Sequence, residues 1–323
     1  MIYNQWYAVL SSNEIGKKQP ITVKRLGVKL VFWRDVAGGI CCIEDKCCHR
    51  GASLGKGWIK GNHVVCPFHG FQYDKSGAVR LIPANGKNSA PPERFKVQSY
   101  IVVEKGGFIW LWWGDQDKCD SQPFFFEDLK NGFSYSQFID PWAVHYSRTI
   151  ENQLDVLHLP FVHGTTIGRG NRTVVNGPVV TSSANLLKFY VNNVADDGTT
   201  VPKTAEQLTG YEKFPQLQFH FPNIWQNIIS KDIRAVAAFV PVDEENTLVY
   251  IRYYQRTINL PVLGPIFSWI GKVVSIVILR QDKRVVQTQL PKKSSLKMDE
   301  KLIPGDAPII EYRKRREQLI NGN

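Results

Sequence analysis

Short apolar runs separated by turns fill the first 115 residues of the chain. The runs at 27–33, 63–68, 100–105 and 108–114 are bounded by glycine, proline or charged residues. Few of these stretches carry the 3.6-residue period of a helix. The pattern therefore predicts β-strands joined by tight turns.

The pattern changes after a polar segment, "GDQDKCDSQPFF", at 114–125, which is typical of a linker. Beyond it the sequence predicts a helical patch near 150–163, strands over about 177–256, and helices at about 265–290 and 307–320. We therefore expect two domains, an all-β domain over 1–118 and a larger α+β domain over 119–323.

The most apolar run, at 260–279, is 20 residues long, which is enough to cross a membrane. It also contains two prolines, two glycines and Lys272, so it predicts a buried core helix after a turn in preference to a membrane span. The sequence leaves open whether residues 260–279 touch a membrane surface. The N-terminal "MIYNQWYAVL" lacks the basic region and cleavage site of a signal peptide. A cytoplasmic location is expected.

The chain is basic, with 40 lysines and arginines against 29 acidic residues and a net charge of +11. These charges are dispersed, apart from "RKRR" at 313–316, for which we expect the solvated face of the last helix. No nucleic-acid partner is expected from this distribution, whereas an acidic protein partner fits it.

Five of the six cysteines lie within 26 residues, and two of them form the pairs Cys47-x-His49 and Cys66-x-x-His69. Clustering with histidine favours a metal site over disulfides. Two loops that each supply one cysteine and one histidine can hold a zinc ion. They can equally hold a [2Fe–2S] cluster with both cysteines on one iron and both histidines on the other. Spacing alone leaves both readings open.

A second group of polar residues lies in "ENQLDVLHLPFVHG". On an ideal helix, His158 and His163 would point about 140° apart. Pro160 lies between them and must kink or distort the helix, which can bring both imidazoles to one point. Asn152, Asp155 and His158 follow as a polar stripe at three-residue intervals. Taken alone, two histidines near a proline are more often structural than metal-binding.

The stretch "CCHRGASLGKGWIKGNHVVCPFHGFQYDKSG" at 47–77 resembles the Rieske motif of Rieske oxygenases, and "NQWYAV", "LGVKLVFWRD" and "AVRLIP" around it fit the same family. The resemblance implies a [2Fe–2S] cluster, with the remaining cysteines as bystanders. The implied cluster ligands are Cys47, His49, Cys66 and His69.

The resemblance also gives a role to the second group. The spacing Asp155-x-x-His158-x-x-x-x-His163 is similar to the mononuclear iron site of the family, whose third ligand is a carboxylate further along the chain. Asp282 in "LRQDKRVVQTQLP" is the best match; Glu151, Asp232 and Asp243 are alternatives by residue type. Asp155 is implied as a bridge from His69 of one subunit to His158 of its neighbour, and Asn152 is a further catalytic candidate beside it.

The resemblance implies an α+β protein, with an N-terminal all-β Rieske domain and a C-terminal helix-grip (START-like) catalytic domain. It further implies a homotrimer, an external reductase or ferredoxin, and O2-dependent hydroxylation or dealkylation of a mid-sized organic substrate. Trp225 and Asn227 are candidates to line the substrate cavity. Two other functions stay open, a Rieske-type electron carrier and a ligand-binding helix-grip protein without turnover.

Overall fold

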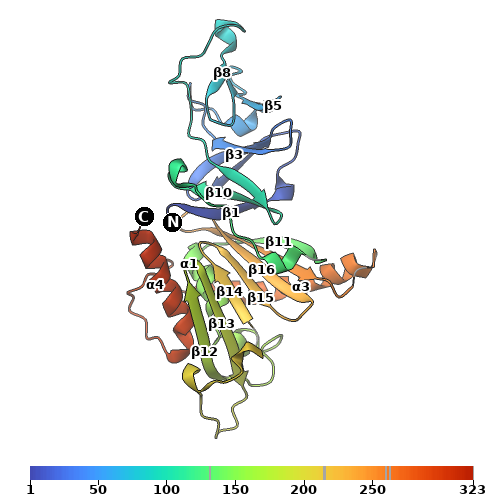
Figure 1. Cartoon of the computed structure of the whole chain (residues 1–323), viewed down its shortest axis with the longest axis vertical. Coiled ribbons are helices and arrows are strands. Elements are labelled where there is room, and N and C mark those ends of the chain that lie inside the picture. The colour runs from blue at the N-terminus through green and yellow to red at the C-terminus, as the bar shows by residue number, and fades with distance from the viewer. Residues whose placement is uncertain (131, 214–215, 259, 262, 323) are drawn as a thin grey trace. The chain divides into compact units, whose positions relative to one another are not determined.

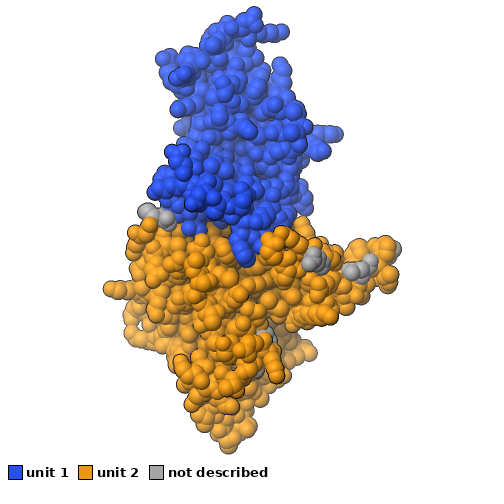
Figure 2. Space-filling view, viewed as in Figure 1, with its two compact units in different colours: residues 1, 3–125 blue, residues 2, 126–323 orange. Residues whose placement is uncertain are grey.

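The computed structural model divides the chain into two compact units (Figure 2), residues 1 and 3–125, and residues 2 and 126–323. The residues that the structure describes are 1–130, 132–213, 216–258, 260–261 and 263–322. The boundary expected from the sequence, between 118 and 119, lies seven residues before the observed division after residue 125.

The first unit is built from antiparallel strands, as the short apolar runs predicted. Three small sheets have the orders β1-β10-β9, β2-β3-β4 and β5-β6-β7-β8 (Figure 1). Their strands are β1 Gln5–Ser11, β2 Ile21–Arg25, β3 Val28–Arg34, β4 Ile40–Glu44, β5 Trp58–Lys60, β6 His63–Val65, β7 Gln72–Tyr73, β8 Val79–Leu81, β9 Val102–Lys105 and β10 Phe108–Trp113. One of the two apolar cores, around Trp33, Leu54 and Tyr73, includes the side chains of Cys47 and Cys66.

The second unit is a seven-stranded antiparallel sheet with helices packed against it (Figure 1), in the order β11-β17-β16-β15-β14-β13-β12. The strands are β11 Ser134–Trp142, β12 Val174–Ser183, β13 Leu186–Val194, β14 Gln216–His220, β15 Ile224–Ile228, β16 Ile233–Pro241 and β17 Thr247–Gln255. The helices are α1 Tyr146–Leu154, α2 Leu159–Val162, α3 Leu263–Val286 and α4 Ala307–Asn321. The α+β class is confirmed.

Short 3₁₀ helices lie in the connecting segments of both units. They are η1 Ser12–Glu14, η2 Leu54–Lys56, η3 Pro83–Asn85, η4 Gln116–Lys118, η5 Glu127–Lys130, η6 Ala205–Gln207, η7 Tyr211–Lys213 and η8 Pro304–Asp306.

One face of the large sheet carries the apolar side chains that hold the helices. Phe219, Trp225, Ala237 and Ile251 are in register across four neighbouring strands, so they share a face. That face meets α4, because the ring of Phe219 contacts the ring of Tyr312 at 5.6 Å between centroids. Burial of this apolar row is the main contribution that positions the helices and, with them, the residues they carry.

The basic run of the last helix is not a solvated face. Arg313 and Arg316 are buried, and Arg313 forms ion pairs with Glu151 at 2.7 Å and Glu300 at 2.7 Å. Arg148 completes the network, at 3.0 Å from Glu151 and 2.9 Å from Glu300. The buried Glu151 and the partly exposed Glu300 balance the two buried guanidinium groups, which joins α1 to α4 and corrects the sequence prediction for Arg313 and Arg316.

Helix α3 is buried on one face only. Within the described part of the chain it is the one helix long and apolar enough to span a membrane by length and composition, and 17% of its most apolar window is buried. It packs against β11 and β17, where the ring of Phe267 contacts that of Tyr253. The expectation of a buried core helix therefore holds for the sheet-facing side, while the opposite side is apolar and exposed.

The buried ion network predicts a large loss of stability when one carboxylate is removed. Glu151→Ala should lower the free energy of unfolding by about 3–5 kcal/mol, because Arg313 and Arg148 lose a partner while buried. Glu317→Ala on the exposed side of α4 is the matched control and should change it by less than about 0.5 kcal/mol. Denaturant unfolding followed by fluorescence measures both, and equal effects of the two changes would contradict a stabilising network.

Candidate metal centres

The two loops with the cysteine–histidine pairs have the same backbone geometry. In each, the cysteine N–H donates to a carbonyl five residues on, from Cys47 to Ala52 and from Cys66 to Phe71, both at 2.8 Å. The glycine four residues after each cysteine donates back to the cysteine carbonyl and has a positive φ, 72° at Gly51 and 73° at Gly70. Only glycine adopts this conformation without strain, so both turns depend on it.

The cysteine and histidine side chains of these loops differ in their exposure to solvent. Cys47 and Cys66 are buried, whereas His49 and His69 are exposed, with ring centroids 4.7 Å apart. The four do not close on one point. Among described residues, three or more ligand atoms of His, Cys, Asp or Glu come within 4.8 Å of one another only in the other candidate site. Buried thiolates below exposed imidazoles fit a two-iron cluster better than a single zinc ion.

Tyr73 is a member of this site that the sequence analysis missed. Its hydroxyl lies 3.1 Å from Sγ of Cys47 and 3.2 Å from Sγ of Cys48, and accepts a hydrogen bond from the Cys48 N–H. A hydrogen bond to a cluster sulfur raises the reduction potential. Cys41 lies in the same apolar core, where burial raises the pKa of its thiol to about 11.

His158 and His163 are positioned by a turn that separates two helices, not by a kink within one helix. Helix α1 ends at Leu154, and Oδ1 of Asp155 accepts hydrogen bonds from the N–H groups of Leu157 at 2.6 Å and His158 at 3.2 Å. The four-residue helix α2 then begins after His158 and ends before His163, with Pro160 in its first turn, where a missing N–H costs nothing. The Asp155 turn separates two helices where we expected one distorted helix.

His158, His163 and Asp282 converge on one point. Oδ1 of Asp282 lies 2.9 Å from Nε2 of His163 and 3.5 Å from Nε2 of His158, and all three ligand atoms lie within 4.8 Å of one another. The two imidazoles come from either end of α2, and the carboxylate comes from the last turns of α3. The packing of α3 against the sheet leaves Asp282 only 2% exposed.

The carboxylate of this group lacks a hydrogen-bond donor on one oxygen. Oδ1 of Asp282 and Nδ1 of His158 are buried, and neither has a hydrogen-bond partner among the described residues. A buried carboxylate oxygen without a donor is costly unless a cation balances it. Two imidazoles and one carboxylate facing a common point are the donor set of a mononuclear non-heme Fe(II) site, so the residues present fit that metal.

Two glutamines that the sequence analysis did not select hold this group in place. Nδ1 of His163 lies 2.8 Å from Oε1 of Gln281, which also accepts from the Thr166 hydroxyl at 3.0 Å. An amide oxygen only accepts, so His163 carries its proton on Nδ1 and leaves Nε2 free as a ligand. On α1, Gln153 donates to Oδ2 of Asp282 at 3.4 Å. Glutamine has no sequence pattern that marks it as a support for a metal ligand.

The two catalytic candidates differ in position, since Asn152 lies on α1 and Asp155 directly follows it. Oδ1 of Asp155 lies 3.6 Å from Nδ1 of His158. Burial would raise the pKa of Asp155, but His158 and the N–H groups of residues 157 and 158 outweigh it and hold that pKa below its usual value. The side-chain nitrogen of Asn152 is buried, with no hydrogen-bond partner within the described ranges. It is Gln153, not Asn152, that contacts the carboxylate of the triad.

The alternative carboxylates are occupied elsewhere. Glu151 belongs to the buried network with Arg313, and Asp232 pairs with Arg256 at 2.8 Å. Asp243 caps a turn by accepting hydrogen bonds from the Glu245 backbone and the Asn246 side chain. Of the four carboxylates considered, only Asp282 meets the two histidines.

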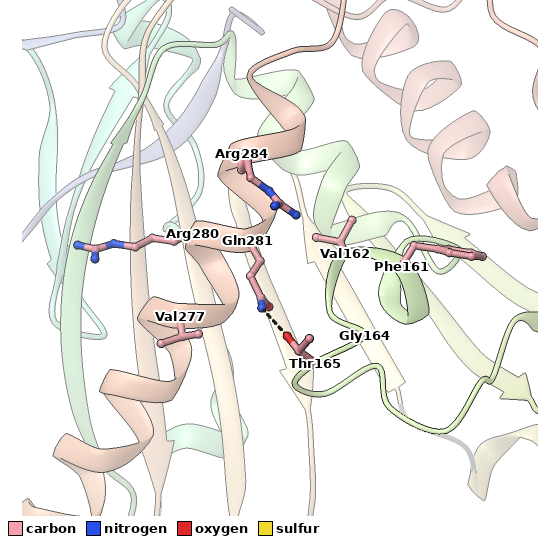
Figure 3. A pocket seen from close by; sticks show the side chains of 8 residues that line it. All are labelled: Phe161, Val162, Gly164, Thr165, Val277, Arg280, Gln281 and Arg284. Atoms are coloured by element: carbon pink, nitrogen blue, oxygen red, sulfur yellow. Dashed lines mark hydrogen bonds between the residues drawn. The ribbon is translucent and has the colours of Figure 1, made fainter.

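Two cavities are lined by chain neighbours of the histidine–aspartate group, although His158, His163 and Asp282 themselves line neither of them. One, of about 480 Å³, lies between α3 and the segment after α2 (Figure 3), lined by Phe161, Val162, Gly164, Thr165, Val277, Arg280, Gln281 and Arg284. The other, of about 230 Å³, lies between α2 and β13 and includes Pro160 and Asn193. Trp225 and Asn227 are on the helix-facing side of β15, but line neither cavity. The indole N–H of Trp225 is buried without an acceptor in the described part of the chain.

Two family models match the chain. The model of the Rieske [2Fe-2S] domain matches residues 5–101, and that of the vanillate O-demethylase oxygenase C-terminal domain matches residues 142–322. Each match contains one of the two candidate metal centres.

Relatives with known activities align with most of the chain. Methylxanthine N1-demethylase NdmA of Pseudomonas putida is 26% identical over 97% of this chain and 88% of its own length. A 4beta-methylsterol monooxygenase of Methylococcus capsulatus is 31% identical over 81% of this chain and 70% of its own. Other relatives are longer: the aligned part covers 60% of toluene-4-sulfonate monooxygenase subunit TsaM1 of Comamonas testosteroni, which is 30% identical over 65% of this chain.

Solved structures share the fold. The NdmA structure from Pseudomonas putida CBB5 superimposes with a TM-score of 0.81 at 24% identity, covering 98% of this chain and 90% of that one. Dicamba monooxygenase bound to dicamba gives 0.78 at 18% identity, with 99% and 98% coverage.

The contact between Gln281 and His163 predicts a metal-retention phenotype. Gln281→Ala should weaken Fe(II) retention by about 10- to 100-fold, because the imidazole loses the acceptor that fixes its tautomer and orientation. Gln281→Glu keeps an acceptor oxygen and should restore most of the loss. Iron content after dialysis against a chelator measures the effect.

Thr165→Ala is the control for this test, since Thr165 accepts only a 3.5 Å bond from the other end of the same amide. If Gln281→Ala and Thr165→Ala retained iron equally well, Gln281 would have no role in orienting His163.

Proposed function

The chain belongs to the Rieske non-heme iron oxygenases, and on that basis we propose that it uses O2 and electrons from an external reductase or ferredoxin to hydroxylate or oxidatively dealkylate a mid-sized organic molecule. The observation that carries the proposal is the convergence of His158, His163 and Asp282 on one point, in the same chain as the Rieske domain. An electron carrier has no use for that second site.

Each centre has a proposed set of ligands. Cys47, His49, Cys66 and His69 would hold the [2Fe–2S] cluster, and His158, His163 and Asp282 the mononuclear Fe(II). When bound, an iron with three protein ligands leaves coordination positions for O2 and supplies, with electrons from the cluster, the oxidising chemistry.

The protein's own residues prepare the mononuclear site. Gln281 holds His163 with Nε2 turned to Asp282, and Gln153 fixes the second carboxylate oxygen. Burial of Asp282 and His163 excludes bulk water and strengthens these interactions. The Asp155 turn fixes the backbone of His158 and keeps its carboxylate beside the imidazole. In this way three segments present one ligand each with little freedom to reorganise.

We assign electron transfer to a path between subunits of a homotrimer. The exposed His69 of one subunit would reach Asp155 of the next, whose carboxylate is 3.6 Å from the His158 imidazole. A head-to-tail ring of three subunits makes this contact once per subunit. The groove beside the cluster loops, of about 870 Å³, is lined by Lys46, Arg50 and Lys96 and would suit an acidic electron donor.

The substrate is identified only by class. By their names, the relatives reported above act on a methylxanthine, a methylsterol and toluene-4-sulfonate. Because these substrates differ so much, membership of the family does not decide between hydroxylation and dealkylation for this chain. Trp225 and Asn227 remain our candidates for substrate contact. Both lie on the helix-facing side of the sheet, and the Trp225 N–H has no acceptor among the described residues. A ligand-binding protein without turnover is the second candidate function, and substrate-dependent O2 uptake separates the two.

Removal of the carboxylate tests the proposal directly. Asp282→Ala should reduce the iron content from about three to about two atoms per chain, abolish turnover and leave the cluster spectrum unchanged. Asp232→Ala, at the paired surface carboxylate, is the control and should keep all three. An Asp282→Ala protein with full iron and activity would place the third ligand elsewhere.

Mixed trimers test the path between subunits. Co-expressed His158→Ala and Cys66→Ser chains should regain about a quarter of wild-type activity, because a working site then needs an intact iron site and an intact neighbouring cluster, two independent events of one half each. Transfer within one chain would leave every mixed trimer inactive. Product formed per chain over the whole co-expressed population, once mixed trimers have been shown to be present in it, distinguishes the two paths and tests the role of Asp155.

A further inference from the structure

Helix α3 exposes a continuous apolar stripe. Seven of its large apolar side chains are between 39% and 56% exposed, and they recur at intervals of three and four residues over about four turns. They are Leu263, Ile266, Trp269, Ile270, Val273, Val274 and Val277. A protein surface rarely leaves so large a contiguous apolar area in water unless something covers it.

The helix cannot turn this stripe inward. On the opposite side, Ser268 is buried, 3.2 Å from the amide of Gln255 and 3.5 Å from the Ser134 hydroxyl. A methyl group at Gly271 would overlap the ring of Tyr253, so helix and strand are in close contact there. The helix is therefore fixed to the sheet along its length, and what covers the stripe must come from outside the unit.

The charge beside the stripe is positive. Arg280 and Arg284 extend the same face toward the end of α3, and the Arg280 side chain is 72% exposed. The acidic side chains on or beside this end of the helix, Asp140 and Asp282, are both buried. Asp140 pairs with Lys283, whose Nζ lies 2.6 Å from its carboxylate, whereas Nε of Arg280 is 4.0 Å away. Within the described residues of α3 no carboxylate is exposed.

We propose that this stripe docks the protein onto an anionic lipid surface, with α3 lying in the plane of the membrane interface. An exposed apolar helix face with a tryptophan and flanking arginines is the composition of an interfacial helix. A second copy that meets the stripe about a two-fold axis is a poorer occupant, because it would oppose Arg280 and Arg284 of one chain with the same arginines of the other. The proposed head-to-tail contact between subunits is assigned above to His69 and Asp155, not to this stripe. A span is excluded by the contacts of α3 with β17.

The proposed surface reaches the candidate site. Val277, Arg280 and Arg284 belong both to this face of α3 and to the lining of the 480 Å³ cavity (Figure 3). Gln281, which contacts His163, lines the same cavity. Docking places the mouth of that cavity at the lipid surface.

Vesicle co-sedimentation of the purified, cofactor-loaded protein tests the docking. We expect binding to phosphatidylcholine vesicles that contain phosphatidylglycerol, weak binding to phosphatidylcholine alone, and loss of binding at high salt. The double change Arg280→Gln and Arg284→Gln should weaken partitioning by about thirtyfold, since each surface cation contributes about a factor of five. Trp269→Glu should abolish it, whereas Val201→Glu, at a 78% exposed valine outside the helix, should not.

The vesicle experiment can also contradict the docking proposal. A wild-type protein that does not sediment with anionic vesicles overturns the proposal, as does an equal loss in the Val201→Glu control. A Trp269→Glu protein with a smaller native mass by light scattering, together with no vesicle binding by the wild type, would assign the stripe to contacts between copies of the chain. The arginine variant lies on the surface and keeps the test valid if Trp269→Glu fails to fold. Binding is measured without turnover, so failure of the proposed enzymatic function leaves this result unaffected.

Discussion

A buried carboxylate oxygen without a hydrogen-bond donor is the constraint around which the second unit is arranged. Asp282 lies in the last turns of α3, and the sheet that holds α3 removes the carboxylate from water. Its Oδ1 faces two imidazoles and has no hydrogen-bond donor among the residues that the structure describes, an arrangement that a cation between these groups would stabilise. The break after Leu154, the short helix α2 and the amides of Gln153 and Gln281 all position groups around that oxygen.

In the cluster loops of the first unit, burial separates the cysteine side chains from the histidine side chains. The cysteines are buried under matching glycine turns, with Tyr73 against one sulfur, while the histidines reach the surface. If these residues hold the cluster as proposed, the exposed imidazoles would be its side nearest to an electron acceptor. In the proposed trimer, the acceptor would be His158 of the neighbouring subunit, whose imidazole lies beside the Asp155 carboxylate.

The sequence predicted the features that depend on local spacing and missed those that depend on distant contacts. The two cysteine–histidine pairs and the all-β first unit follow from spacing and periodicity, whereas the approach of His158, His163 and Asp282 was implied by the resemblance to the Rieske oxygenases. The break at Asp155 was predicted as a kink, because a proline pattern does not show that a side chain will cap a turn before it. The support from Gln281, the burial of Arg313 against Glu151, 162 residues away, and the exposed side of α3 depend on which elements pack together, which a single sequence does not show.

The central claim, that Asp282 and the two histidines form an Fe(II) site, is tested most directly by the linkage between metal binding and stability. Iron-depleted protein is titrated anaerobically with Fe(II), and the unfolding of the second unit is followed. The account predicts that the wild type is stabilised by about 2.7 kcal/mol at a hundred times the dissociation constant, and that Asp282→Asn shows no such change. Equal stabilisation of the two proteins, or none in either, would contradict it.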